Sequence, residues 1–259
     1  MDSELPTIWV RNSVGRAPVE VHGMSISGGA MPLYLAEGGS LVAEDVHLRG
    51  GAESAFDVGG AGKLVLRRVR ATSKAKGVRL NVDPAPGEDA LDVLVDDLVI
   101  HDLPRREDTA QPYEALLIRG NVRAVVNDVR IIDSDTLGLV LIDPMDAEVT
   151  GLEVDEPLWA GVYVLVEQGN WALRDVTILG VRADELASVF YGMDVGVGVA
   201  VEKAGGGRID NLAITRPQGI GIFGMLLNLR VNPDCTILAA KLALEVLAAV
   251  HSALRHVRI

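Results

Sequence analysis

The sequence is poor in cysteine and aromatic residues, and it has no long hydrophobic run. A single cysteine, Cys235, among 259 residues excludes a disulfide-stabilised scaffold. No stretch reaches about 18 uncharged apolar residues, so we expect no membrane-spanning helix. Apolar residues nevertheless make up 49% of the chain, which excludes an intrinsically disordered protein. The composition therefore indicates a folded protein with a large aliphatic core.

Positive charge is also scarce. The chain has 24 Lys and Arg against 36 Asp and Glu, which gives a formal net charge of -12. This charge repels phosphate backbones, so nucleic acid is not expected as a partner. The N-terminal residues lack the basic and apolar segments of a secretory signal peptide. The sequence thus predicts either an intracellular protein or a chain that begins after such a segment.

One short pattern recurs along the whole chain: an apolar residue, two polar residues and a second apolar residue. Copies occur at 21–24, 43–46, 66–69, 95–98, 126–129, 149–152, 173–176, 209–212 and 254–257, with a looser copy at 231–236. Neighbouring copies are 21 to 24 residues apart, except at three longer intervals that indicate insertions. A further apolar segment, often opening with Gly or Ala, follows most copies, as at 77–80, 115–118, 138–141 and 161–164. Such a period is typical of solenoid repeats.

With this pattern, the chain resembles the right-handed parallel β-helix, or pectin-lyase-like, superfamily. The resemblance implies a single all-β domain of nine to ten coils, each with three short strands. We expect residues 1–17 to form an N-terminal lead-in or cap and residues 18–259 to form the β-helix, which could be truncated within its last coil. One segment leaves an alternative open, because residues 237–256 also fit an amphipathic helix.

The resemblance implies that the third strand of each coil forms the floor of a substrate groove. Side-chain alternation gives this floor two outward rows. The first comprises Tyr34, Asp57, Arg79, Leu117, Val140, Tyr163, Gly198 and Gly221, and the second comprises Ala36, Gly59, Asn81, Arg119, Ile142, Leu165, Ala200 and Phe223. Cleavage of a polysaccharide needs paired carboxylates, or a carboxylate-bound Ca²⁺ with a basic residue, on that floor, and the floor does not supply them. The catalytic candidates that it does offer are Tyr34, Asp57 and Arg79, and an ordinary polar ladder is the alternative interpretation.

The rest of the floor is apolar and lies between two insertions, 104–113 and 182–194. An apolar face of this kind favours contact with another protein chain. We predict a binding face at Leu117, Val140, Ile142, Tyr163, Leu165 and Phe223. The insertions themselves could instead cover this face, with Phe190 and Tyr191 as plugs.

Acidic residues gather at the corner before the floor strand. They are Asp102, Asp133, Asp135, Asp155 and Glu156. Stacked carboxylates can bind Ca²⁺, the only cofactor that the sequence suggests. The alternative is an exposed acidic edge that keeps the solenoid soluble.

Two functions remain open at this stage. The first is a noncatalytic β-helix module of a secreted or envelope protein, with a protein partner or a second copy of itself as its ligand. The second is a carbohydrate-active enzyme, a lyase, hydrolase or epimerase, that acts on an acidic polysaccharide. The catalytic motifs of the polygalacturonase-like members are missing, since only Asp96-Asp97 and Arg208-Ile209-Asp210 resemble fragments of them.

Overall fold

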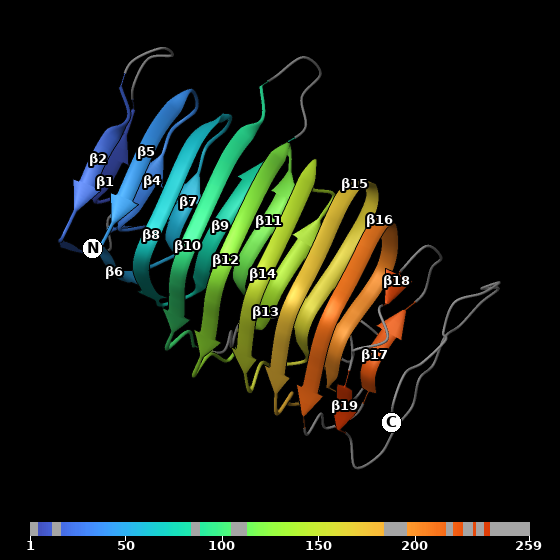
Figure 1. Ribbon diagram of the computed structural model, residues 1–259. Helices are drawn as coiled ribbons and strands as arrows, with labels where there is room; N and C mark the ends of the chain where they lie inside the picture. The colour runs from blue at the N-terminus through green and yellow to red at the C-terminus, as the bar shows by residue number, and fades with distance from the viewer. Residues whose placement is uncertain are drawn as a thin grey trace.

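The chain folds into parallel β-structure. The computed structural model describes residues 5–11, 17–83, 89–104, 113–183, 196–215, 220–224, 230–231 and 236–238. Over these residues it contains one sheet of 19 strands and no helix (Figure 1). Every strand pairing is parallel and joins segments one repeat apart in the sequence, as in the pairing of β8 with β10 and of β10 with β12. The all-β prediction is therefore confirmed for the described residues, none of which forms a helix able to cross a membrane.

The strands form two sets. One set comprises β1 (Ile8–Val10), β4 (Leu33–Leu35), β7 (Ser54–Val58), β9 (Lys76–Val82), β11 (Glu114–Gly120), β13 (Leu137–Ile142) and β17 (Ile220–Gly224). The other set comprises β2 (Val19–His22), β3 (Ser25–Ser27), β5 (Gly39–Glu44), β6 (His47–Gly51), β8 (Gly62–Ser73), β10 (Leu91–His101), β12 (Val122–Ile132), β14 (Asp146–Asp155), β18 (Arg230–Val231) and β19 (Thr236–Leu238). Two long strands, β15 (Ala160–Leu179) and β16 (Val197–Thr215), belong to both sets. We call the outer surface of the first set the floor face.

The polar pair of each repeat forms a bend, which lies between two strands in the first two repeats and within one strand from β8 onward. Its second residue has a positive φ in every described repeat: Gly23 (59°), Asp45 (54°), Arg68 (49°), Asp97 (57°), Asp128 (53°), Gly151 (70°), Asp175 (52°) and Asn211 (52°). Gly, Asn and Asp tolerate this left-handed conformation best, which explains the composition of the column. Pairing skips only this one residue, so Asp96 and Leu98 both stay in register with the next repeat. The three short strands expected per repeat are therefore wrong from β8 onward, because two of them join into one bent strand and, in β15 and β16, all three do.

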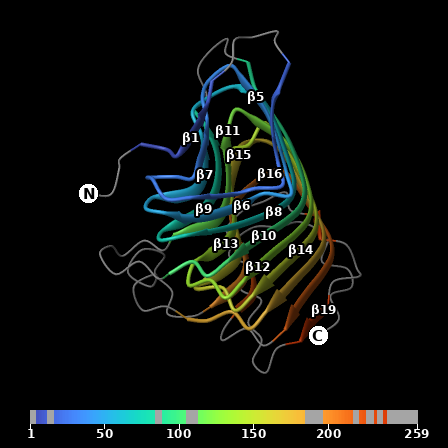
Figure 2. The ribbon, with the colours of Figure 1, turned by 90° about the vertical axis from the view of Figure 1, so that its left-hand side faces the viewer.

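The interior is filled by aligned aliphatic side chains. One row of paired residues runs through Leu66, Val95, Val126, Val149, Leu173 and Ile209, all of them buried. Figure 2 looks along the stack and shows the strands wrapping around this interior. Space for the one interior tryptophan, Trp171, comes from its neighbour Gly207, because a Cβ there would lie 2.0 Å from the indole ring. Close packing of this kind accounts for the low aromatic content.

The structure describes only the start of the C-terminal segment 237–256, for which coil and amphipathic helix were the alternatives. Thr236–Leu238 forms β19 and pairs with Ala213, Ile214 and Thr215 of β16. These residues continue the strand pairing of the repeat before them. The remainder of the segment that also fits a helix, 239–256, lies outside the described residues.

Candidate functional site: a polar cluster on the floor face

The three predicted catalytic candidates lie on neighbouring strands of the floor face. Tyr34 of β4 pairs with Asp57 of β7, which pairs with Arg79 of β9. The row begins one strand earlier than expected, at Trp9 of β1, which pairs with Tyr34. Because paired residues of parallel strands point to the same side of the sheet, these side chains project together from the floor face.

Asp57 and Arg79 form an ion pair. Arg79 Nη1 donates to Asp57 Oδ2 at 2.8 Å, and the Val58 backbone N–H donates to Asp57 Oδ1 at 2.8 Å. Both side chains are largely buried, with exposed fractions of 14% for Asp57 and 23% for Arg79. Burial raises the pKa of Asp57 above its usual range, although the neighbouring Arg79 charge acts in the opposite direction. A carboxyl of this kind holds a proton more readily than an exposed one, which is the property of a general acid.

Tyr34 lies between an aromatic neighbour and a glycine. Its ring meets the Trp9 ring edge to face, with centroids 6.0 Å apart and planes at 76°. The hydroxyl lies over Gly59, where a Cβ would come within 1.9 Å of the Tyr34 oxygen. Burial and the charge of Asp57 raise the pKa of the Tyr34 phenol. Tyr34 is therefore neutral at physiological pH, and it can donate a proton or a hydrogen bond but does not serve as a phenolate base.

The structure adds residues that the sequence did not single out. Glu114 Oε1 of β11 lies 3.3 Å from Arg79 Nε and 3.9 Å from Lys76 Nζ. The Lys76 ammonium also lies over the Tyr113 ring, 5.9 Å from its centroid. The insertion before β11 hides the position of Glu114 in the repeat pattern. The pairing of β11 with β9, which brings Glu114 beside Lys76, is what places it in the cluster. The polar cluster thus consists of Tyr34, Asp57, Lys76, Arg79 and Glu114.

The apolar part of the floor face is closed. Leu117, Val140 and Tyr163 pair in register as predicted, yet all three are buried within the chain. They form a second core outside the sheet, together with Leu137, Trp159, Ala160, Val197 and Ala200 and with the half-buried Ile142 and Leu165. The expectation of an open binding face is therefore corrected at Leu117, Val140 and Tyr163, whereas Ile142 and Leu165 are half-buried and the side chain of Phe223 is not described. Phe190 and Tyr191, the plugs considered above, lie outside the described residues.

The predicted register is wrong at the end of this row. Tyr163 pairs with Ala200 and Ala200 with Phe223, so these two residues replace Gly198 and Gly221. The error is a shift of two residues along β16. Because side chains alternate with a period of two, such a shift keeps the same face outward and leaves no trace in the sequence pattern.

The acidic corner is a set of turn residues. Asp102, Asp133 and Glu156 have positive φ angles of 54°, 48° and 46°, and each occupies the turn before the floor strand of its repeat. Asp135 Oδ1 lies 2.6 Å from Arg182 Nη1, and the half-buried Asp155 ends β14. Among the residues that the structure describes, no three His, Cys, Asp or Glu side chains come together as a metal site. Ca²⁺ binding at Asp102, Asp133, Asp135, Asp155 and Glu156 stays a prediction that this geometry does not strengthen.

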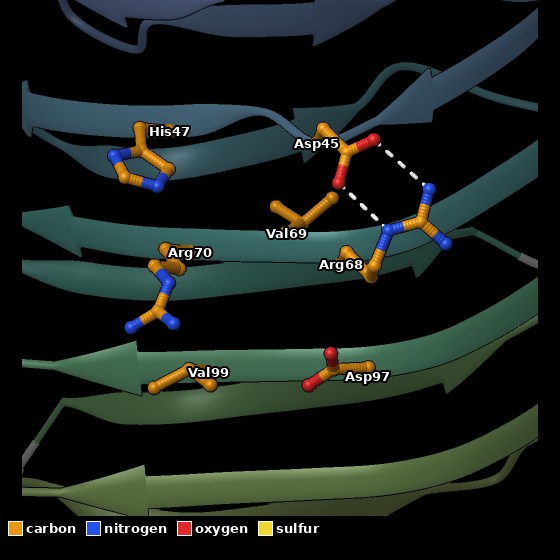
Figure 3. Close-up of a pocket in the computed structure, with 7 residues that line it drawn as sticks. All are labelled: Asp45, His47, Arg68, Val69, Arg70, Asp97 and Val99. Carbon is orange, nitrogen blue, oxygen red and sulfur yellow. Dashed lines mark hydrogen bonds and ion pairs between the residues drawn. The ribbon is translucent and has the colours of Figure 1, made fainter. Parts of the chain in front are cut away.

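A second polar feature lies along the bend (Figure 3). A shallow cavity of about 210 Å³ has Asp45, Arg68 and Asp97 on one side and His47, Arg70 and Val99 on the other. It shares Asp97 with a further hollow of about 370 Å³ that continues past Asp128 to Asp175. Arg68 is engaged with Asp45, whereas Asp97 and Arg70 make no ion pair with any described residue.

Comparison with known proteins gives no guide to the chemistry. No family model, no curated protein and no solved structure matches this chain. The two polar features and the closed apolar cluster are therefore the basis for a proposed function.

Proposed function

We propose that this chain is a noncatalytic right-handed parallel β-helix module of a secreted or envelope protein, with a structural or interaction role. Parallel pairing of segments one repeat apart supports the β-helix, and parallel crossovers are right-handed in about 98% of cases. The repeat pattern that resembles the pectin-lyase-like superfamily supports the same architecture. Leu117, Val140 and Tyr163 of the predicted binding face are buried within the chain, so the proposal does not rest on these three residues as an interaction surface.

One observation carries the noncatalytic part of the proposal: Arg79 is held between two carboxylates. Asp57 and Glu114 approach it from the neighbouring strands β7 and β11, at 2.8 and 3.3 Å. A cation held in this way attracts both acids, offsets part of their negative charge and links three repeats. The same use of charge recurs elsewhere, since Arg123 pairs with Asp92 of the repeat before it, and Arg174 pairs likewise with Glu148. Charged side chains thus connect repeats on the second set of strands as well as on the floor face.

The test is a search for turnover of an acidic polysaccharide. We expect no new reducing ends and no absorbance of unsaturated uronates when the protein is incubated with polygalacturonate or alginate. Turnover that disappears in the double variant Asp57→Asn/Arg79→Gln would overturn the noncatalytic proposal. A matched control is Asp92→Asn/Arg123→Gln, which removes a comparable cross-repeat pair outside the polar cluster.

A second candidate function rests on the raised pKa of Asp57. In a carbohydrate-active enzyme, a buried carboxyl beside an arginine could protonate a leaving group while the neutral Tyr34 hydroxyl donates a hydrogen bond. The substrate would be an acidic polysaccharide, whose carboxylates Lys76 and Arg79 would attract. In this case the turnover assay above gives a signal, and Tyr34→Phe lowers it.

A further inference from the structure

Arg70, on the outer surface of the second set of strands, has no acid beside it in its row. Its register neighbours are His47 of β6 and Val99 of β10, so neither adjoining strand places a carboxylate next to it. By contrast, Arg123 and Arg174 each meet an acid of a neighbouring repeat. The chain has 36 Asp and Glu, so acids to pair with Arg70 are plentiful and are nevertheless not placed there.

A second arginine without an acid lies close by. Arg49 of β6 donates from Nη2 to His47 Nδ1 at 3.2 Å and makes no ion pair with a described residue. Because an arginine can only donate, His47 Nδ1 accepts, and the ring proton is on Nε2. Figure 3 shows a ring nitrogen of His47 on the side that faces Arg70. Two exposed guanidinium groups and one imidazole N–H therefore gather around His47. Neighbouring like charges do not stabilise a strand pair, so the fold itself does not explain this arrangement.

The shallow cavity of about 210 Å³ along the bend adjoins these donors. His47 and Arg70 lie at its strand end beside the buried Val99, and the unpaired Asp97 lies at its bend end. In Figure 3 the guanidinium of Arg70 points away from Asp97. An anion is therefore attracted to the strand end of the cavity and repelled from the bend end.

We propose that the strand end of this cavity binds a tetrahedral oxyanion, a phosphate or sulfate group, through Arg49, Arg70 and the Nε2–H of His47. Arginine donates charge-assisted hydrogen bonds to such groups. A tetrahedral oxyanion accepts donors from several directions at once, and here the donors come from two neighbouring strands, about 4.8 Å apart. The inference gives the proposed interaction role a ligand and rests on that role. It is separate from the polar cluster, which lies on the floor face.

The first experiment follows the ring signals of His47 by NMR while sodium sulfate or sodium phosphate is added at constant ionic strength. His47→Gln identifies these signals by their loss. We expect a saturable shift whose midpoint Arg70→Gln raises at least about tenfold, because one charge-assisted contact is lost. The control is Lys63→Gln, which removes an exposed cation of the same strand on the other side of the bend. It should change the midpoint by less than about twofold, since a distant surface charge is screened. No saturable shift with either anion, or equal effects of the two variants, overturns the proposal.

A change of opposite sign tests the position of the ion. Asp97→Asn removes an unpaired acid of the cavity, and asparagine tolerates its positive φ of 57°. Sulfate should then bind about twofold more tightly or better, because a repulsion is lost. Asp96→Asn is the control, since Asp96 does not line the cavity. An affinity that Asp97→Asn leaves unchanged places the ion outside the cavity and overturns the proposal.

A free ion and a sulfate group on a polymer share this chemistry, and dextran sulfate distinguishes them. Calorimetry compares it with inorganic sulfate, and tighter binding per sulfate group indicates a polymeric ligand, whereas equal binding indicates a free ion. Both results support the site if Arg70→Gln weakens binding, and dextran sulfate binding that Arg70→Gln leaves unchanged overturns it. Loss of the anion site without polysaccharide turnover leaves the noncatalytic proposal standing. Sulfate binding together with turnover overturns the noncatalytic proposal and keeps the anion site.

Discussion

Arg68 donates two hydrogen bonds to the carboxylate of Asp45 in the preceding repeat, with Nε 2.7 Å from Oδ1 and Nη2 2.9 Å from Oδ2. Both residues are at the bend and both have positive φ angles, 49° for Arg68 and 54° for Asp45. Arg68 is the one long side chain in a column otherwise made of Gly, Asp and Asn. Its two-point contact with the residue above it in the column explains why arginine is found at this unfavourable backbone position.

The first prediction concerns the pH dependence of this pair. The hydrogen bonds from Arg68 lower the pKa of Asp45 below its ordinary value of 3.8. A carboxyl whose pKa falls on folding contributes stability above its unfolded pKa and loses it as the pH drops through the folded value. We therefore expect Arg68→Gln to lower the melting temperature slightly at neutral pH and to have no such effect in acid well below pH 3.8.

A double-mutant cycle isolates this interaction. Asp45→Asn, Arg68→Gln and the double variant should give a coupling that vanishes in acid. An equal effect of Arg68→Gln at both pH values would show that backbone conformation, and not the ion pair, determines stability at this position.

The second prediction concerns the left-handed bend. Asp97 has a φ of 57°, whereas its neighbour Asp96 lies in register within the strand. We expect Asp97→Val to lower the free energy of unfolding by about 1–2 kcal/mol, because a branched side chain is disfavoured in this conformation. Asp96→Val, the control, should change it by less than about 0.5 kcal/mol at an exposed strand position. Asp97→Gly should be tolerated, and urea unfolding measures all three.

The bend was predictable from sequence, but only as a position. The recurring polar pair located it in every described repeat, because its second residue is Asp, Asn or Gly, which tolerate a positive φ best, everywhere except at Arg68. Its consequence for the strands was not predictable, since a single left-handed residue interrupts pairing at one position and the strand resumes beyond it. The inward rows were also predictable, because Val95, Val126 and Val149 repeat at the same offset from the bend.

The floor face was predictable as far as its insertions allowed. Tyr34, Asp57 and Arg79 come from repeats of nearly equal length, so their alignment follows from spacing alone. Glu114 follows an insertion, which hides its register with Lys76. Burial of Leu117, Val140 and Tyr163 was equally hidden, because an alternating pattern shows which side of a strand faces outward and says nothing about what packs on that side.

The third prediction concerns Asp57. Burial raises the pKa of this carboxyl above its ordinary value of 3.8, and a group of this kind stabilises the fold at low pH and loses that contribution as the pH rises through its folded pKa. We expect Asp57→Asn, which cannot ionise, to gain stability relative to the wild type as the pH is raised from acid to neutrality. The measurement is the free energy of unfolding in urea across that range. The control is Glu53→Gln, an exposed position just before the same strand.

If the Asp57→Asn difference does not change with pH, then Arg79 fully offsets the burial of the carboxylate. Asp57 would then be an ordinary ion-pair partner. Without a raised pKa, it would no longer be a candidate general acid.

The fourth prediction concerns the closeness of neighbouring floor strands at Gly77. A Cβ at this position would lie 2.0 Å from the backbone oxygen of Ala115 on β11, and a backbone atom cannot move aside as the end of a side chain can. We expect Gly77→Ala to lower the free energy of unfolding by about 3 kcal/mol, at the upper end of the usual overpacking range.

Gly50→Ala is the control, because a Cβ there meets nothing within 4 Å and the change carries only the penalty of its positive φ of 66°. That penalty is about 1–2 kcal/mol. Since Gly77 lies beside Lys76 and two residues before Arg79, the displaced strand should also loosen the Arg79 contact with Glu114. Equal losses for the two variants would mean that β9 and β11 can separate at this point without disturbing the rest of the stack.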